Sequence, residues 1–576
     1  MIKRLEFLRD IWRLARPYWF SEDRWAGRGL LAVIVCMSLT LVFITVLLNQ
    51  WNNAFYDSLQ NRDLDGFYRQ LGYFCLLAFA YIVVAVYQLY LNQMLQIRWR
   101  RWLTERHLEQ WLKDRVYYDL QTRGSATDNP DQRMADDIGA FVTQTLTLTL
   151  GFLEAVVSLA SFIGILWGLS GSLEFTLWDR AFSVPGYMVW VALCYAVLGT
   201  WLTKRVGRPL VTLNFNQQRY EADFRFSLVR LRENAEGVAL ISGEADEAGI
   251  FRARFANVVQ NWWAIMRRRK ALAWLTNSYA QAAVVFPFLA AAPRYFSGAI
   301  QLGGLMQTAS AFARVQGALS WFVDAFTELA SWKATVDRLT TFRRAMDEAR
   351  ARRENPDALR SEVGAWPVLD LLDVDIDLPG GEPLLRGVHL RVEPGDTLLV
   401  TGPTGSGKST LLRAVAGLWP EGRGRILLPG DHSLMFLPQR PYLPLGTLRQ
   451  TLSYPSPHEG IPDEAMRQAL ALCGLERLGE RLDHTAYWPQ ELSPGEQQRL
   501  AFARLILQAP DFVFLDEATS AVDEAGEEAL YALLRETLPH AAVVSVGHRG
   551  TLEAFHARRL ALTGGRPGTA RLVESH

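Results

Sequence analysis

The sequence is poor in cysteine and has no excess charge of either sign. It contains four cysteines, Cys36, Cys75, Cys194 and Cys473, and no two of them stand at a spacing typical of a disulfide or a metal site. Lysine plus arginine number 60, and aspartate plus glutamate also number 60. We therefore interpret the cysteines as ordinary apolar residues and expect no nucleic-acid partner.

A secretory signal is also missing. The first twenty residues have neither a clean apolar core nor a small-residue cleavage site, so we expect no signal peptide. Leu5, Leu8, Trp12 and Ala15 recur at helical spacing among basic residues. This pattern predicts a helix that lies along a membrane interface, and the alternative is an amphipathic helix buried in the protein.

Charge is missing from several long apolar stretches. A helix needs about 20 apolar residues to cross a hydrocarbon core of about 30 Å. Four stretches reach that length without any charge: residues 29–48, 71–97, 182–203 and 271–293. Two more, residues 140–173 and 302–323, are interrupted only by Glu154 and Arg314 respectively. We therefore predict six membrane spans.

Basic residues are unevenly distributed between the connections. They concentrate in residues 3–28, 98–133, 204–270 and 333–353, and few occur near residues 49–70, 174–181 and 294–301. By the positive-inside rule both termini are expected on the cytoplasmic side. Six spans satisfy the even number that this orientation requires.

The pattern of the chain changes after Arg343. A charged, helix-favouring run ends at Asn355-Pro356, and short apolar strands separated by Gly and Pro follow. Because 576 residues exceed one ordinary core, we predict two domains. Residues 1–355 are expected to form an all-α transmembrane domain with an N-terminal interfacial helix, and residues 356–576 an α/β domain with a mainly parallel sheet.

A glycine-rich run predicts a phosphate-binding loop. It joins an apolar strand at residues 397–400 to a helix and reads Gly402, Pro403, Thr404, Gly405, Ser406, Gly407, Lys408, Ser409, Thr410. The glycines allow backbone N–H groups to surround phosphates, and the helix N-terminus adds a positive dipole end. Lys408 is expected to reach the outer phosphates of ATP, and the Ser409 hydroxyl to bind Mg²⁺.

Two adjacent acids follow a second strand at residues 512–515. Asp516 ends that strand, where its carboxylate can hold the shell of a metal ion. The neighbouring Glu517 can polarise an attacking water molecule. Together with the glycine-rich run, these residues predict an ATPase.

The run Leu492-Ser-Pro-Gly-Glu-Gln-Gln-Arg499 narrows this prediction, because it resembles the signature motif of ATP-binding cassette proteins. Gln439 resembles that family's Q-loop glutamine, residues 520–523 its D-loop and His548 its switch histidine. The resemblance implies that Glu517 and His548 are catalytic, and that Ser409, Gln439 and Asp516 hold Mg²⁺. It also implies nucleotide contacts by Ser493, Gly495, Glu496 and Asp523.

In that family two cassettes close head to tail on shared ATP molecules. This chain has one cassette and six predicted spans, so it supplies half of such an assembly. A homodimer with two composite ATP sites is the simplest completion, and a heterodimer with a similar chain is the alternative.

The transmembrane half resembles the SbmA/BacA and YddA-like group, which is related to the peroxisomal fatty acyl transporters. The segments that carry this resemblance are residues 97–104, 128–133, 233–236, 243–244 and 436–444. It implies an exporter-type fold with long cytoplasmic helix extensions, in the bacterial inner membrane. Uptake of a bulky hydrophilic solute, such as a peptide or corrinoid, is favoured by this resemblance. Export of lipid or acyl-CoA is an alternative, and so are a non-transporting membrane regulator and an ATP-gated pore.

The cassette departs from the family pattern at a few positions. Pro494 replaces the first signature glycine, but Pro is well tolerated at the first position of a helix. Ser493 and Glu496 are expected to form a capping box that preserves the helix start. Glu496 stands where many members have Gln. No aromatic residue occurs near Leu378-Pro379, where many relatives stack the adenine.

The two intramembrane charges are costly at mid-bilayer, roughly 3 kcal/mol each on insertion scales. Glu154 and Arg314 are therefore expected to face a cavity or a partner helix. Contact with the transported solute is one hypothesis. Snorkelling or a structural pair across the helix bundle is the alternative.

Overall fold

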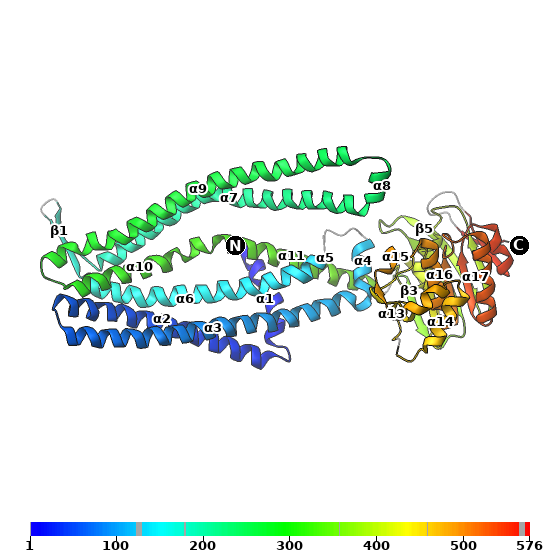
Figure 1. Cartoon of the computed structure of the whole chain (residues 1–576), viewed down its shortest axis with the longest axis horizontal. Coiled ribbons are helices and arrows are strands. Elements are labelled where there is room, and N and C mark those ends of the chain that lie inside the picture. Colours follow the sequence, from blue (N-terminus) through cyan, green and yellow to red (C-terminus); the bar gives the residue numbers. More distant parts are fainter. Residues whose placement is uncertain are drawn as a thin grey trace. The chain divides into compact units, whose positions relative to one another are not determined.

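The computed structural model describes residues 2–122, 130–177, 180–355, 358–457, 459–563 and 571–575 (Figure 1). It separates into two compact units. Unit 1 comprises Met1–Glu109 and Asn129–Arg343, and unit 2 comprises Gln110–Asp128 and Arg344–His576. The expected boundary at Asn355-Pro356 stays a prediction, because Pro356 lies outside the described residues, as do Asp128 and Asn129.

Unit 1 is built from long helices. They are α1 (Ile2–Trp19), α2 (Arg24–Gln60), α3 (Leu64–Leu112), α5 (Pro130–Gln132) with the π-helical turn η2 (Arg133–Asp137), α6 (Ile138–Ser170), α7 (Tyr187–Glu233), α8 (Ala235–Leu240), α9 (Glu244–Phe296), α10 (Leu302–Asp324) and α11 (Phe326–Arg353). A hairpin of β1 (Ser172–Leu177) and β2 (Arg180–Pro185) joins α6 to α7. The division between the units falls inside α3 and α11.

Within the described residues, four helical stretches are long and apolar enough to cross a membrane: Arg24–Gln60, Leu64–Thr122, Pro130–Ser170 and Tyr187–Glu233. They contain four of the predicted spans. The remaining two fall on the continuous helices α9 and α10, so the total of six stays a prediction. At 53 residues α9 is roughly 80 Å long, far more than a bilayer core requires.

Two predicted spans differ from the structure at one end. The helix expected from residue 182 begins at Tyr187, because Arg180–Pro185 form β2. The helix expected to reach residue 173 ends at Ser170, since Gly171 adopts a left-handed φ of +64° and the chain then enters β1. Pattern alone does not locate these ends, because residues 171–173 and 182–185 continue the uncharged runs of the two helices without a break.

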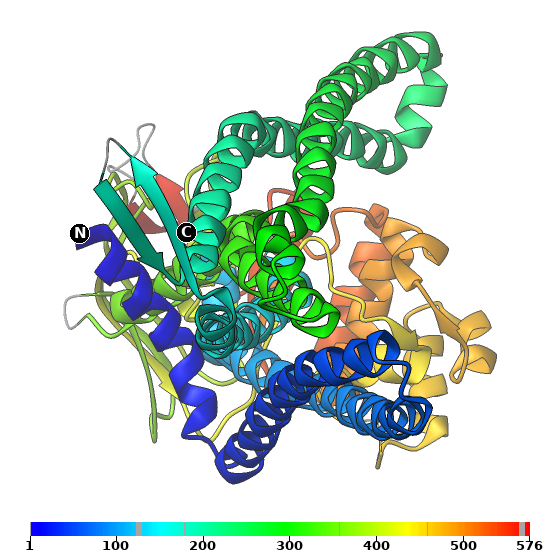
Figure 2. The same cartoon turned by 90° about the vertical axis from the view of Figure 1, so that its left-hand side faces the viewer.

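Helices α7 and α9 run side by side and antiparallel, and α8 closes their far end (Figures 1 and 2). The Tyr195 and Tyr279 rings stack with their centroids 4.2 Å apart. The Asn261 amide donates to the Leu213 carbonyl at 2.9 Å and to Gln217 Oε1 at 2.8 Å. These contacts fix which parts of the two helices lie at the same level.

All four cysteines are free. Cys473 is buried in the cassette core, whereas Cys36, Cys75 and Cys194 are exposed on the helices of unit 1.

The described part of unit 2 contains two large sheets and a two-stranded antiparallel sheet of β9 and β10. A six-stranded sheet has the order β14-β13-β6-β12-β11-β8 and is parallel except for β14. A four-stranded sheet has the order β3-β7-β4-β5. The strands are β3 (Arg360–Gly364), β4 (Leu369–Asp377), β5 (Pro383–Val392), β6 (Thr397–Thr401), β7 (Gly422–Pro429), β8 (Leu434–Leu437), β9 (Gly446–Thr447), β10 (Thr485–Ala486), β11 (Phe512–Asp516), β12 (Ala542–Val546), β13 (Arg558–Thr563) and β14 (Arg571–Ser575).

Helices surround these sheets. They are α12 (Lys408–Val415), α13 (Leu448–Ser453), α14 (Asp463–Leu472), η3 (Glu476–Arg481), α15 (Trp488–Glu491), α16 (Pro494–Gln508), α17 (Glu524–Thr537) and η4 (Gly550–Phe555). The turn η1 (Lys113–Arg115) and helix α4 (Val116–Thr122) also belong to unit 2.

The sheet register determines where the site forms. Leu515 of β11 pairs with Leu437 of β8 and with Ser545 of β12, and Ser545 pairs with Leu399 of β6. Because these strands are parallel, their carboxyl ends meet at one edge of the sheet. The predicted loop and the two acids follow these strands directly.

Candidate functional site: a nucleotide-binding edge of the cassette

The glycine-rich loop connects β6 to α12, as the sequence predicts. Its backbone needs glycine, because Gly402, Gly405 and Gly407 have φ values of +149°, +81° and +96°. A Cβ at Gly402 would stand 2.9 Å from the Leu562 carbonyl oxygen, so a side chain there would displace the neighbouring strand. Helix α12 begins at Lys408, which leaves its first N–H groups directed at the loop.

The loop's polar side chains are suited to an anion. Lys408 Nζ donates to the carbonyls of Gly402 and Pro403, at 2.8 and 3.0 Å. Ser406 is 8% exposed, and its Oγ has no hydrogen-bond partner among the described residues. A buried hydroxyl without a partner costs free energy, so this atom fits an external acceptor such as a phosphate oxygen. Thr410 lies in the first turn of α12.

Asp516 and Ser409 meet at the carboxyl end of β11. The Ser409 hydroxyl donates to Asp516 Oδ1 at 2.9 Å. Burial raises the pKa of Asp516, the hydroxyl of Ser409 opposes this shift, and the charge of Glu517 adds to it. Hard oxygen donors of this kind fit Mg²⁺, which commonly takes one or two protein ligands and completes its shell with water and phosphate. No cluster of three or more His, Cys, Asp or Glu side chains that could form an all-protein metal cage occurs in the described ranges.

Glu517 is positioned by its backbone and by two neighbouring strands. Its φ is +50°, and its N–H donates to the Val546 carbonyl at 3.0 Å. Gln439 follows β8, and its Nε2 donates to Glu517 Oε2 at 3.1 Å. His548 follows β12, and its Nδ1 lies 3.8 Å from Glu517 Oε1. Gln439, which precedes Glu517 in the sequence, and His548, which follows it, therefore lie near different oxygens of the same carboxylate.

These residues border an open cavity of about 350 Å³. It is lined by Ser409, Arg413, Pro438, Gln439, Arg440, Asp516 and Glu517. The structure thus brings together the predicted residues of the phosphate loop, the Q-loop and the acidic pair. The arginines Arg413 and Arg440 had no predicted role.

The signature segment forms the start of α16. Ser493 is the N-cap: its Oγ accepts from the Glu496 N–H at 3.3 Å, and Glu496 Oε2 accepts from the Ser493 N–H at 2.9 Å. The predicted capping box is therefore confirmed, with Pro494 at the first helical position. Arg477 pairs with Glu496, and this bond, with the Ser493 N–H, lowers the pKa of Glu496.

The Ser493 side chain hydrogen-bonds to Glu496, and Glu496 also pairs with Arg477. Among the residues described, neither side chain forms a hydrogen bond or an ion pair with the phosphate loop of the same chain. Gly495 packs closely, since a Cβ there would stand 2.9 Å from the Ala521 carbonyl oxygen. Asp523 precedes α17, with Oδ1 3.9 Å from Arg499 Nη2. The signature side of the site is thus structurally formed but separate from the loop of the same chain.

Gln498 links three of the motifs. Its side chain is 3% exposed, and its Nε2 donates to the Gln439 carbonyl at 2.9 Å and to Ser520 Oγ at 3.2 Å. Its Oε1 accepts from the Ala521 N–H at 2.9 Å. The amide thereby joins the signature helix to the Q-loop and the D-loop. The sequence placed Gln498 inside the signature run, but nothing in the spacing indicated this linking role.

Arg549 makes a similar connection directly after His548. Its guanidinium donates to the carbonyls of Val522 and Ser520, at 3.0 and 3.2 Å. The D-loop is therefore tied to the residue next to the predicted switch histidine. A long-range contact of this kind has no signal in a single sequence.

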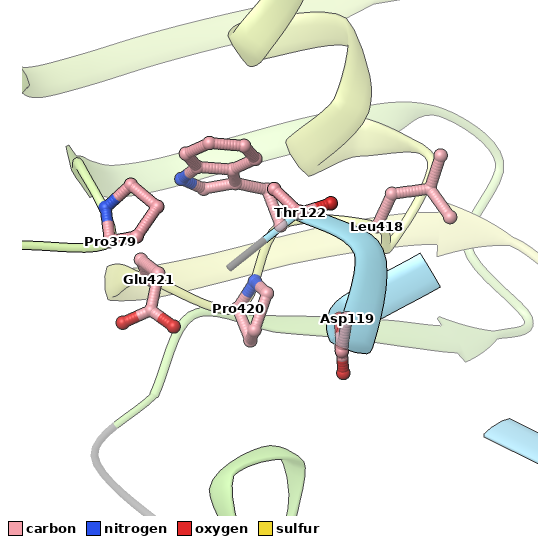
Figure 3. A pocket seen from close by; sticks show the side chains of 7 residues that line it. Asp119, Thr122, Pro379, Leu418, Pro420 and Glu421 are labelled. Atoms are coloured by element: carbon pink, nitrogen blue, oxygen red, sulfur yellow. The ribbon is translucent and has the colours of Figure 1, made fainter. Parts of the chain in front are cut away.

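An aromatic residue does approach Pro379, although it comes from a different segment. Trp419 lines a small cavity of about 10 Å³ with Asp119, Thr122, Pro379 and Leu418 (Figure 3). Its side chain is buried, and its Nε1 donates to the Asp377 carbonyl at 2.8 Å. A cavity of this size holds about one water molecule and not an adenine ring. Trp419 is therefore tied to the segment before Pro379 by its hydrogen bond to Asp377.

Both regions of the chain match known families. Residues 14–296 match the family described as ABC transporter transmembrane region 2, and residues 385–520 match the family described as ABC transporter. The inner membrane ABC transporter ATP-binding protein YddA of Escherichia coli (strain K12) is 34% identical over 538 residues, which cover 93% of this chain and 94% of that protein.

Two eukaryotic relatives are similar over almost the whole chain. ABC transporter D family member 2, chloroplastic, of Arabidopsis thaliana is 35% identical over 631 residues, covering 96% of this chain and 86% of that protein. The lysosomal cobalamin transporter ABCD4 of Homo sapiens is 28% identical over 598 residues, covering 97% and 95%.

The fold also has a solved counterpart. A bacterial Atm1-family ABC exporter with ATP bound superimposes with a TM-score of 0.70 and 18% sequence identity, over 95% of this chain and 94% of that chain. The exporter-type fold, a helical transmembrane region followed by an α/β cassette, is thereby confirmed.

Proposed function

Because the chain belongs to the ABC transporter family, we propose that two copies of it form a pump that imports a bulky hydrophilic solute. The family membership establishes ATP-driven transport across a membrane. Family membership therefore disfavours the alternative that the protein is a membrane regulator without transport activity. The identity of the solute, the direction of transport and the pairing of two identical chains are our proposals.

The observation that carries the mechanism is the assembly of seven side chains at one sheet edge. Lys408 and the N–H groups of α12 bind the outer phosphates, and Ser406 offers a buried hydroxyl without a partner. Ser409, Asp516 and Gln439 would hold Mg²⁺, which would supply positive charge beside the phosphates. Glu517 orients the attacking water and accepts its proton, and His548 assists at the same carboxylate.

The signature supports a composite site. Ser493, Gly495 and Glu496 make no contact with their own phosphate loop among the described residues, although the capping box at Ser493 is fully formed. An N-terminus of a helix favours anions. We therefore propose that this helix start binds the nucleotide held by the phosphate loop of a second copy, and that Asp523 lies at the junction.

Two charges in the membrane region support a polar path for the solute. Glu154 on α6 and Arg314 on α10 are both exposed in the single chain, and neither forms an ion pair with a described residue. Exposure to lipid would cost roughly 3 kcal/mol for each. We propose that both face a water-filled path between the two copies and contact the solute there. Charge-neutral substitutions Glu154→Gln and Arg314→Gln that leave transport kinetics unchanged would contradict this role.

The proposed cargo is a peptide or a corrinoid. It is supported by the resemblance to YddA-like proteins and by the printed activity of one relative, a cobalamin transporter. We also propose a bacterial inner-membrane location with both termini and the cassette in the cytoplasm, supported by the basic connections and by the inner-membrane relative.

Uptake assays test direction and cargo together. Cells that lack or overproduce the protein receive labelled cobalamin or a labelled peptide, and Lys408→Ala serves as the inactive control. We expect accumulation to rise with the wild-type protein and not with Lys408→Ala. Loss of preloaded label, or faster clearance of a fluorescent lipid or acyl-CoA, would instead identify an exporter.

A further inference from the structure

An unusual concentration of positive charge lies at one level of the α7–α9 hairpin. Lys204, Arg205 and Arg208 follow the predicted span on α7, and the run Arg267–Lys270 precedes the predicted span on α9. All seven side chains are exposed. We call these seven residues the basic belt.

The helix register brings the two halves of the belt together. On one side, a Cβ at Gly207 would stand 3.9 Å from Leu272 Cδ2. On the other, Asn261 hydrogen-bonds to the Leu213 carbonyl at 2.9 Å. The belt residues of α7 and α9 lie at or next to these levels, and the helices run side by side in both views (Figures 1 and 2).

No acidic residue of these helices neutralises the belt. Helix α7 has no Asp or Glu before Glu221, and α9 has none after Glu247. None of the seven side chains forms an ion pair with a described residue. Arg98, which follows the span on α3, is different, because its Nε donates to Asp23 Oδ2 at 3.1 Å. The belt therefore presents seven exposed positive charges that have no ion-pair partner among the described residues and are available to an anionic ligand.

Exposed indole rings flank the belt. Trp201 and Trp274 lie one turn to the membrane side and are 59% and 72% exposed, while Trp262 and Trp263 lie on the other side. The Arg269 guanidinium stands 5.7 Å from the centre of the Trp262 ring. Tryptophan is enriched where a protein crosses the headgroup region, since its ring combines an apolar body with an N–H donor. This combination fits the cytoplasmic headgroup layer better than an aqueous path.

We propose that the basic belt is a binding surface for anionic phospholipids of the cytoplasmic leaflet. Their phosphates supply the missing negative charge, the guanidinium groups bind phosphate oxygens in pairs, and the indole rings lie among the headgroups. Because α7 and α9 continue directly from the belt to α8, bound lipid would stabilise the hairpin at the membrane level. The proposal does not depend on the cargo or on the direction of transport.

The test compares the binding of two lipids to the full-length protein. Wild-type protein is reconstituted in phosphatidylcholine vesicles that contain trace spin-labelled phosphatidylglycerol or phosphatidylcholine, and electron spin resonance gives the relative association constants. We expect phosphatidylglycerol to bind about fivefold more strongly, the effect of roughly one basic side chain near a charged surface.

Matched variants assign this preference to the belt. The variant R205Q/R208Q/R267Q/R268Q removes four belt charges, and we expect it to bind the two lipids equally. The control variant R219Q/R225Q/R230Q/R232Q removes four charges farther along α7, and we expect it to keep the wild-type preference. Equal binding by the wild-type protein, or a full preference in the belt variant, would overturn the proposal.

Salt provides a second measurement that needs no variant. Because the contact is electrostatic and partly exposed, the preference of the wild-type protein should fall when ionic strength rises to about 0.5 M. Inorganic phosphate at the same ionic strength as chloride should displace no more lipid than chloride does, since a free phosphate is not the proposed ligand. A preference that ignores salt would contradict the proposal even if the belt variant does not assemble.

Discussion

At the scale of single residues, the backbone and the carboxylate of Glu517 are held in place by contacts with neighbouring residues. Its backbone has a left-handed φ of +50°, which is uncommon for a residue other than glycine, and its carboxylate lies between Gln439 and His548. A side chain fixed in this way is suited to orient one water molecule beside a phosphate.

We predict that Glu517→Gln slows ATP hydrolysis at least about 100-fold, because the amide cannot accept the proton of the attacking water. ATP binding should persist, because Lys408 and the loop are unchanged. Steady-state hydrolysis and equilibrium binding of labelled ATP check the two parts separately. Hydrolysis at the original rate would show that the proton acceptor is another group.

Asp516 has a pKa raised by burial, so its ionised form is disfavoured in the folded cassette without nucleotide. The stability contributed by the protonated form is present below the ordinary pKa and is lost as pH rises through the raised value. Asp516→Asn should therefore raise the thermal midpoint of the nucleotide-free protein at pH 7 and abolish Mg²⁺-dependent hydrolysis.

The same shift predicts a pH dependence of metal binding. Protons should compete with Mg²⁺ at Asp516 at a higher pH than at an ordinary aspartate, so the Mg²⁺ concentration for half-maximal hydrolysis should rise as the pH is lowered. Calorimetry of the variant and Mg²⁺ titrations at several pH values measure these effects. An unchanged or lower midpoint for Asp516→Asn at pH 7 would contradict the account.

Contiguous motifs were predictable residue by residue, and contacts between distant segments were not. The phosphate loop could be predicted because its glycines, lysine and serine lie in one short run of the sequence. Gln498, Arg477 and Trp419 bind residues that lie 19 or more positions away in the sequence. Their partners are chosen by the packing of α16, η3 and β4, which one sequence does not display.

At the scale of elements, the start of α16 shows how a departure from the family pattern is accommodated. Pro494 lacks an N–H, but the first N–H groups of a helix have no partner within the helix. Its fixed φ suits the first helical position, and the capping box satisfies the groups that follow.

We predict that Pro494→Gly, which restores the family's glycine, lowers the stability of the cassette by less than about 1 kcal/mol through added freedom of the unfolded chain. ATP hydrolysis should change little. Ser493→Ala should cost about 1 kcal/mol, because it removes the cap. Chemical denaturation gives the free energy of unfolding of each variant and shows which change costs more. A larger loss for Pro494→Gly would mean that the proline does more than begin the helix.

The contact between α4 and α11 is an ion pair within unit 2. Arg353 Nε and Nη2 donate to the two oxygens of Asp119, at 2.7 and 3.1 Å, and the Asp119 side chain is 7% exposed. Arg353 also donates to the Gly417 carbonyl, next to the end of α12. The pair therefore joins α4 to the helix that begins at the phosphate loop.

We predict that Arg353→Ala destabilises unit 2 by about 3 kcal/mol, because it leaves the buried Asp119 carboxylate without a partner. Arg353→Ala combined with Asp119→Ala should cost less than the sum of the single changes. The neighbouring Arg352→Ala is the control, and calorimetry of the full-length protein gives the midpoints. An equal loss of stability in Arg352→Ala and Arg353→Ala would show that the Arg353–Asp119 pair does not stabilise unit 2.

The lengths of the elements were only partly predictable. Long apolar runs located the four candidate membrane helices, three of them from runs without charge and one from the run that contains Glu154, because hydrocarbon disfavours charge. The extensions of α3, α7 and α9 beyond the predicted spans are polar, so no apolar run indicates them, and those of α7 and α9 pack against each other. The hairpin of β1 and β2 was missed, since its outer residues 172–173 and 182–185 continue the apolar runs and the charged residues between them have the pattern of an ordinary connection.

At the scale of the whole molecule, one chain carries a phosphate loop and a signature that do not meet within it. The loop, Asp516 and Glu517 lie at one sheet edge, while Ser493 caps a helix with its own Glu496. The account therefore requires two copies, in which each nucleotide is bound by the loop of one and the signature of the other. Closure on nucleotide can then act on the membrane helices of both.

Trapping of nucleotide by vanadate in mixed dimers tests this requirement most directly. Lys408→Ala disables a loop, and Ser493→Asp places a negative charge at the signature while it keeps a good helix cap. Dimers purified by two different tags carry both changes on one subunit, or one change on each subunit. If the sites are shared, the dimer with one change on each subunit keeps one intact site and traps nucleotide, whereas the dimer with both changes on one subunit traps none. The opposite result, trapping only when both changes lie on one subunit, would show that each chain forms its own site and would contradict the account.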